Sequence, residues 1–150
     1  MEVRVDVNID TKKLQQQFES LLDDDCMYQI HDLFFKMNDP YVPMDEGILA
    51  HTSVDITKEC VHYKQPYAHY MYVGEVYGPN IPIFEDGIIV GWFSPPGQKK
   101  HPTGEQLKYN TEKHPLASKE WDKAMMRDKG DVFLKQVADI LLKRCKELYG

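Results

Sequence analysis

An amphipathic helical pattern near each end of the chain is the feature that most constrains the fold. In residues 12–37, apolar side chains recur every three to four positions after the potential cap residues Asp10 and Thr11. Residues 20–25 are rich in aspartate and are expected to interrupt this helix. A second stripe in residues 131–148 follows a stop signal at Gly130 and predicts a C-terminal helix.

Short segments typical of β-strands lie before the first helix and between the two helices. Val3, Val5, Val7 and Ile9 alternate with polar residues, which predicts a strand with one buried face. The segments "ILAHTSVDI", "ECVHYK" and "PYAHYMYVGEVYG" are rich in β-branched and aromatic residues and are separated by polar turns. We therefore predict an α+β fold: an antiparallel sheet of four to five strands, packed against the 12–37 helix and covered by the 131–148 helix.

Length and composition favour one soluble globular domain over residues 1–150. The chain has 150 residues, 42% hydrophobic and 28% charged, enough to bury a core without disulfides or metals. Its three cysteines lack C-x-x-C spacing, which favours a reducing compartment. The alternating start is unlike a signal peptide, and the apolar runs are too short to span a bilayer. We expect a protein made in the cytoplasm that has no contact with membranes.

Residues 78–114 form the most unusual segment of the chain. They hold five of the nine prolines, and connections this long are usually functional or disordered. Fully extended, the segment would reach about 100 Å, or about half that as a returning hairpin. Its "IIVGWF" run could form a strand or an apolar plug. The segment also presents two apolar aromatic residues and a basic pair, which are Trp92, Phe93, Lys99 and Lys100. We predict that this loop is mobile in the isolated protein and becomes ordered against an adjacent subunit or neck ring.

The charge distribution disfavours tight non-specific binding to nucleic acid. The net charge is −6, and residues 1–97 carry 6 basic against 16 acidic side chains. A protein that binds by neutralising phosphates should show a basic surplus. Only residues 98–129 are basic, with 8 basic and 5 acidic side chains.

The tyrosines of "QPYAHYMYVGEVYGPN" pose the main functional question. As a strand, this segment places Tyr70 and Tyr72 on one face and Tyr67 on the other. An RNA-binding sheet needs basic residues beside its aromatics, and Lys64 is the only cation in residues 61–80. Tyrosines on both faces suit a sheet that packs on a helix and on a partner subunit. Tyr70, Tyr72 and Tyr77 are therefore candidate interface residues.

Catalytic, cofactor and metal sites are not predicted by any motif. None of the six histidines forms an H-x-x-x-H pair, and the sequence lacks G-x-S-x-G, P-loop and dinucleotide-binding patterns. Cys60 and His62 would share a strand face as a thiolate–imidazole pair, but no residue supplies an orienting group. We expect a protein that is not an enzyme, has no cofactor and binds no metal. A small hydrolase using Cys60 and His62 is one alternative, and a single-strand nucleic-acid or RNA-binding module using the tyrosine-rich sheet is another.

Two ordered motifs in the middle third resemble a known family. "PMDEGIL" followed by "YKQPYAHYMYVG" is similar to the P-x-D-x-G-x-L and Y-A-x-Y-x-x-x-G signatures of minor capsid or tail-completion proteins of tailed phages. The segments "GWFSPPGQKKHPTG" and "SKEWDKAM" resemble the branch found in long-tailed phages and prophages of Gram-positive bacteria. The matching positions are Pro43, Asp45, Gly47, Leu49, Tyr67, Ala68, Tyr70 and Gly74. Where relatives often have Gly-Thr after the tyrosines, this chain has Gly74–Glu75.

This resemblance implies a structural role at the head–tail junction of the virion. Such proteins form a homo-oligomeric ring, which the resemblance suggests is a hexamer rather than a dodecamer, between the portal complex and neighbouring neck or tail-terminator proteins. Phage DNA passes through the ring without sequence-specific binding, and an acidic protein suits a channel that must not trap phosphate. The motif residues are expected to stabilise the fold. Pro43 and Gly47 would fix a turn in which Asp45 accepts hydrogen bonds from backbone amides, and Ile48 and Leu49 would enter the core.

Overall fold

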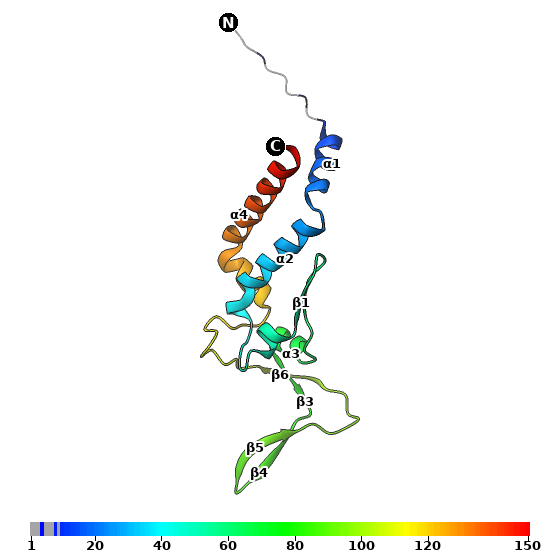
Figure 1. The fold of residues 1–150 in the computed structure, drawn as a ribbon. Coiled ribbons are helices and arrows are strands. Elements are labelled where there is room, and N and C mark those ends of the chain that lie inside the picture. The colour runs from blue at the N-terminus through cyan, green and yellow to red at the C-terminus, as the bar shows by residue number, and fades with distance from the viewer. Residues whose placement is uncertain (1–3, 5–7, 9) are drawn as a thin grey trace. The chain divides into compact units, whose positions relative to one another are not determined.

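The structure is a computed structural model that describes residues 4, 8 and 10–150. The strand predicted from Val3, Val5, Val7 and Ile9 therefore lies outside the described residues. The chain divides into two compact units. Unit 1 comprises residues 1–37, 56–62 and 129–150, and unit 2 comprises residues 38–55 and 63–128. Figure 1 shows the chain from the N-terminal helix to the C-terminal helix.

Unit 1 is built mainly from helices at the two ends of the chain. Helix α1 spans Thr11–Leu21 and helix α2 spans Asp24–Asn38, so the predicted interruption of the first helix is confirmed. Helix α4 spans Trp121–Tyr149 and is kinked at Lys129, whose φ of −133° is not helical. The kink lies next to the stop predicted at Gly130 and separates the part of α4 in unit 2 from the part in unit 1.

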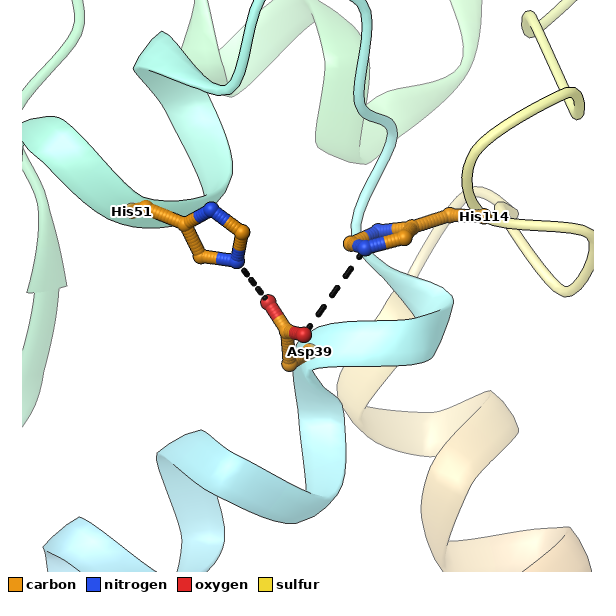
Figure 2. A group of neighbouring side chains, drawn as sticks. All are labelled: Asp39, His51 and His114. Atoms are coloured by element: carbon orange, nitrogen blue, oxygen red, sulfur yellow. Dashed lines mark hydrogen bonds and ion pairs between the residues drawn. The ribbon is translucent and has the colours of Figure 1, made fainter.

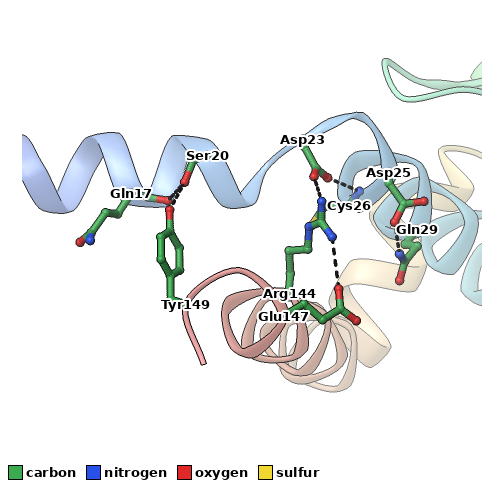
Figure 3. A network of polar contacts seen from close by, with 9 residues as sticks. All are labelled: Gln17, Ser20, Asp23, Asp25, Cys26, Gln29, Arg144, Glu147 and Tyr149. Atoms are coloured by element: carbon green, nitrogen blue, oxygen red, sulfur yellow. Dashed lines mark hydrogen bonds and ion pairs between the residues drawn. The ribbon is translucent and has the colours of Figure 1, made fainter.

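Asp23 explains why the first helix breaks where it does. Its carboxylate accepts a hydrogen bond from the Cys26 backbone N–H at 2.9 Å, which caps the start of α2. The same carboxylate pairs with the guanidinium of Arg144 on α4, and Arg144 also pairs with Glu147 (Figure 3). The Cys26 amide, and then Arg144, lower the pKa of the Asp23 carboxyl. The Asp23 side chain therefore caps the start of α2 and links this helix to α4.

Helices α2 and α4 run antiparallel within unit 1. Phe34 packs edge-on against Phe133 with ring centroids 5.6 Å apart, while Asp23 at the other end of α2 meets Arg144. The Cys26 side chain is buried between these contacts. The turn at residues 57–60 also lies on α2, because the backbone carbonyl of Thr57 is 2.9 Å from His31 Nδ1. Packing of apolar stripes, rather than a sheet, therefore holds unit 1 together.

Unit 2 is centred on the first turn of α4. Trp121 is 4% exposed, and the rings of Tyr63 and Tyr72 pack edge-on against it with centroids 5.2 and 5.0 Å away. Around this cluster lie the short helix η1 (Asp39–Tyr41), the π-helix η2 (Ile48–Thr52) and helix α3 (Ala68–Val73). These elements bury further core residues, which are Tyr41, Val42, Leu49, Ala50, Ala68, Ala124 and Met125.

The α+β class, with antiparallel strands and a C-terminal helix, is confirmed, but the strands do not form one sheet. In the described part of the chain they form three two-stranded sheets. Strand β1 (Val54–Ile56) pairs with β2 (Val61–Tyr63), and β3 (Glu75–Gly78) pairs antiparallel with β6 (His101–Gln106). Strand β4 (Ile81–Glu85) pairs antiparallel with β5 (Ile88–Phe93). The expected sheet of four to five strands is wrong in this respect because the core is filled by helices and by aromatic side chains.

The first part of the tyrosine-rich segment, Ala68–Val73, is a helix rather than the predicted strand, whereas Glu75–Gly78 forms strand β3 as predicted. Pro66 precedes α3, and Gly74 ends it with a left-handed φ of +73°, donating its N–H to the Tyr70 carbonyl. Within α3, Ala68 and Tyr72 are four residues apart and face the core together. The aromatic composition favours a strand, whereas the spacing of Ala68 and Tyr72 and the flanking Pro66 and Gly74 favour a short helix.

Candidate functional site

The segment predicted to be a protruding loop contains a β-hairpin. Strands β4 and β5 pair from Ile81↔Phe93 to Glu85↔Ile88, with a register shift after Ile83 (Figure 1). The two turn residues, Asp86 and Gly87, have φ values of +49° and +79°. A tight two-residue turn needs positive φ at both positions, and Asp-Gly is a favoured sequence for it. The strand expected from "IIVGWF" is therefore confirmed as β5.

This hairpin exposes an unusual amount of apolar surface. Among its aromatic residues, Trp92 is 62% exposed, Phe84 is 60% exposed and Phe93 is 49% exposed. Its other exposed apolar residues are Ile81, Ile83, Ile88, Ile89 and Val90. We call these eight residues the hairpin surface. An isolated two-stranded ribbon is only marginally stable in water. A ribbon whose exposed side chains are apolar is therefore suited to packing against another protein surface.

The predicted basic residues lie directly after the hairpin. Lys99 and Lys100 are both exposed, and the Lys100 ammonium donates to Asn80 Oδ1 at 3.0 Å. Asn80 also donates to the Tyr77 carbonyl and thereby joins the start of β4 to the end of β3. This arrangement places positive charge at the base of the hairpin surface.

The candidate interface tyrosines separate into two groups. Tyr72 packs inside unit 2 against Trp121 and donates to the Asp122 carboxylate at 2.9 Å. Tyr70 and Tyr77 pack on each other, with ring centroids 4.7 Å apart, and both lie close to His69. Tyr70 and Tyr72 lie in helix α3 and Tyr77 lies in strand β3, so these tyrosines do not share one sheet as the sequence suggested.

The residues shared with the phage-family motifs mostly support the fold of unit 2. Pro43 and Leu49 are buried, and Gly47 has a φ of +84° at the start of η2. Asp45 accepts from the Asn110 side-chain amide at 3.4 Å, rather than from the nearby backbone amides that the sequence suggested. Ile48 is 39% exposed, so only Leu49 enters the core as expected.

The second motif has a similar role. Ala68 is buried against the core, whereas Tyr67 is 41% exposed. Gly74 is buried where two other segments approach it closely. A side-chain carbon added at Gly74 would lie 2.6 Å from Lys119 Cβ and 2.8 Å from the Tyr109 hydroxyl. The motif glycine is therefore required for both its conformation and its packing.

Two histidine side chains from separate segments converge in unit 2 on the Asp39 carboxylate (Figure 2). Its Oδ1 lies 2.6 Å from His51 Nε2, and its Oδ2 lies 3.7 Å from His114 Nε2. His114 is 9% exposed, and its Nδ1 donates to the Val42 carbonyl at 2.8 Å. We call Asp39, His51 and His114 the His–Asp cluster. Sequence reasoning missed it because no spacing motif joins positions 39, 51 and 114.

The hydrolase alternative gains no support from the geometry. Cys60 is exposed, and its sulfur contacts the Thr57 hydroxyl at 3.9 Å. Among the contacts of the described residues, none joins Cys60 to His62. Cys60 lies just before strand β2 (Val61–Tyr63), which contains His62.

Comparison with known proteins identifies no relative. No family model, no curated protein and no solved structure matches this chain. Within the described residues, no helix combines the length and the apolar character needed to cross a membrane.

Proposed function

We propose that this chain is a structural virion protein of a tailed phage, acting at the head–tail junction as a minor capsid or tail-completion protein. It forms a homo-oligomeric ring that joins the portal complex to the tail and lets DNA pass. It is assembled in the host cytoplasm and carries out no catalysis. Its partners are other copies of itself and the neighbouring neck or tail-terminator proteins.

The hairpin surface is the observation that carries this proposal. Its eight apolar residues expose roughly half of their side-chain area, and a large side chain presents on the order of 150 Å². The hairpin therefore offers on the order of 600 Å² of apolar surface over its two faces together, compared with the ~800 Å² that each partner contributes to a standard protein interface. A monomer in water would leave this surface uncovered, whereas a ring or a stack of neck proteins would bury it.

Three further features support an assembly role. The motifs of the middle third resemble those of tail-completion proteins, and most of their positions are buried, which suits residues that stabilise the fold. Residues 1–97 are acidic, while Lys99 and Lys100 are basic and exposed, so one copy offers a complementary charge to the next. An acidic protein also suits a DNA channel because it repels phosphate.

The proposal is tested by altering the hairpin surface in the phage that encodes the chain. Inactivating the gene should leave DNA-filled heads and complete tails that do not join, visible by electron microscopy of lysates. The variants Phe84→Ser and Trp92→Ser should fold, because both side chains are more than half exposed. Complementation with either variant should nevertheless fail to restore joined particles.

Leu142→Ser provides the matched control. Leu142 is 59% exposed on α4, so this change removes a similarly exposed apolar side chain outside the hairpin. It should restore infectious particles. Normal joining by the hairpin variants, or normal particles without the gene, would contradict the proposal.

A further inference from the structure

The His–Asp cluster has the composition and the geometry of a transition-metal site. We propose that Asp39, His51 and His114 bind one Zn²⁺ ion per chain and that the ion cross-links three segments of unit 2. This inference is independent of the proposed role in the virion, because it depends only on side chains within one unit.

The donor set selects the class of metal. Two imidazole nitrogens and one carboxylate oxygen are ligands typical of Zn²⁺ and of similar first-row ions. Mg²⁺ and Ca²⁺ prefer sets of oxygen donors and would gain little from two histidines. Three protein ligands leave one coordination position for water, which is a common arrangement for zinc.

The distances require only a small rearrangement. In a tetrahedral zinc site with bonds of about 2.0–2.1 Å, neighbouring donor atoms lie about 3.3 Å apart. Here Asp39 Oδ1 and His51 Nε2 are 2.6 Å apart, Asp39 Oδ2 and His114 Nε2 are 3.7 Å apart, and all three donors lie within 4.8 Å of one another. The two distances from Asp39 lie within about 0.7 Å of the zinc spacing, and the exposed His51 side chain can rotate away from Asp39 to lengthen the shorter one.

His114 is already oriented as a ligand. The Val42 carbonyl can only accept, so His114 Nδ1 must carry the proton of their 2.8 Å hydrogen bond. In the neutral ring, this leaves the lone pair on Nε2, which faces Asp39. A backbone carbonyl that fixes the tautomer of a histidine is the usual second partner of a zinc ligand.

The proton on His51 Nε2 would have to leave that atom when the metal binds. This nitrogen now lies at hydrogen-bonding distance from Asp39, whereas a zinc ligand must present a lone pair there. The His51 side chain is 47% exposed, so the proton can leave to water or move to Nδ1. The ion would then replace the hydrogen bond between His51 and Asp39 with two metal–ligand bonds.

The ion would tie together elements that are distant in the sequence. Asp39 begins η1, His51 lies in η2, and His114 belongs to the segment that leads to α4. These elements flank the motif turn at residues 43–49. Zinc binding should therefore stabilise unit 2 against unfolding.

Isothermal titration of the full chain, freed of metal by a chelator, tests the inference. Zn²⁺ should bind at one equivalent with a Kd in the micromolar range or tighter and should raise Tm, while Mg²⁺ should do neither. His51→Ala should weaken Zn²⁺ binding at least tenfold and abolish the Tm shift. This variant is preferred to His114→Ala because His114 is buried and its loss could prevent folding.

Two controls separate this site from other zinc ligands in the chain. His62→Ala removes an exposed histidine outside the cluster and should leave the affinity unchanged. Co²⁺ bound at the cluster should show a nitrogen–oxygen ligand spectrum without a thiolate charge-transfer band, which Cys60 or Cys145 would produce. Absence of binding, binding unaffected by His51→Ala, or a thiolate band would overturn the inference.

Discussion

Replacing Gly74 by alanine tests whether the motif glycine is required for packing as well as for its backbone conformation. Gly74 ends α3 with a φ of +73°, and its carbonyl accepts from the Leu107 N–H at 2.9 Å. The added methyl group would lie 2.6 Å from Lys119 Cβ and 2.8 Å from the Tyr109 hydroxyl. Because Lys119 Cβ is attached directly to the backbone, side-chain rotation cannot relieve this overlap.

The expected cost has two parts. A left-handed conformation costs alanine about 1–2 kcal/mol relative to glycine. Overpacking against Lys119 and Tyr109 adds about 1–3 kcal/mol, because the backbone must move. The total of about 2–5 kcal/mol is a large fraction of the about 5–15 kcal/mol that stabilises a typical domain.

Gly87→Ala is the matched control. Gly87 has a φ of +79° in the hairpin turn, but an added methyl group there would meet no atom within 4 Å. Both variants share the conformational cost and the same entropy change in the unfolded chain. The difference in free energy of unfolding between the two variants therefore measures the effect of the close approach at Gly74 alone.

Urea unfolding followed by tryptophan fluorescence measures both variants. In a Trp92→Phe background, the buried Trp121 is the remaining tryptophan and reports on unit 2. The free energy of unfolding should fall by about 1–3 kcal/mol more for Gly74→Ala than for Gly87→Ala. Equal losses within about 0.5 kcal/mol would refute the packing argument.

Two further predictions concern pH. Burial raises the pKa of four tyrosines, which are Tyr41, Tyr63, Tyr72 and Tyr109. Because the folded protein keeps phenol protons that the unfolded chain loses above about pH 10, the free energy of unfolding should fall above this pH. A free energy of unfolding that stays constant at alkaline pH would contradict the raised pKa of these tyrosines. The lowered pKa of Asp23 contributes stability that is present above about pH 4 and is lost as the pH falls. The difference in free energy of unfolding between wild type and Asp23→Asn should therefore shrink from pH 5 to pH 2. A constant difference would show that the Asp23 charge does not stabilise the fold.

The helical ends of the fold were predictable from local signals. Apolar periodicity located the helices, and the break between α1 and α2 follows from an aspartate that can cap the second helix. The kink of α4 at Lys129 lies beside the glycine that predicted a stop. These features depend on neighbours within a few residues, which a sequence displays directly.

The middle of the chain was harder to predict because long-range packing decides it. The aromatic composition of α3 favours strands, but Tyr72 packs on Trp121, nearly fifty residues later in the sequence. The strands pair only two at a time, which no local pattern indicates. The Asp86–Gly87 turn was a readable hairpin signal within the presumed loop. The His–Asp cluster had no sequence signal at all, since its members belong to three separate segments.

Electron cryomicroscopy of purified particles of the encoding phage would test the central proposal most directly. The account predicts a ring of identical copies of this chain at the head–tail junction, with the hairpin surface of β4 and β5 buried against a neighbouring copy or an adjacent neck protein. Particles that lack the chain, or that hold it elsewhere with this hairpin in solvent, would contradict the account.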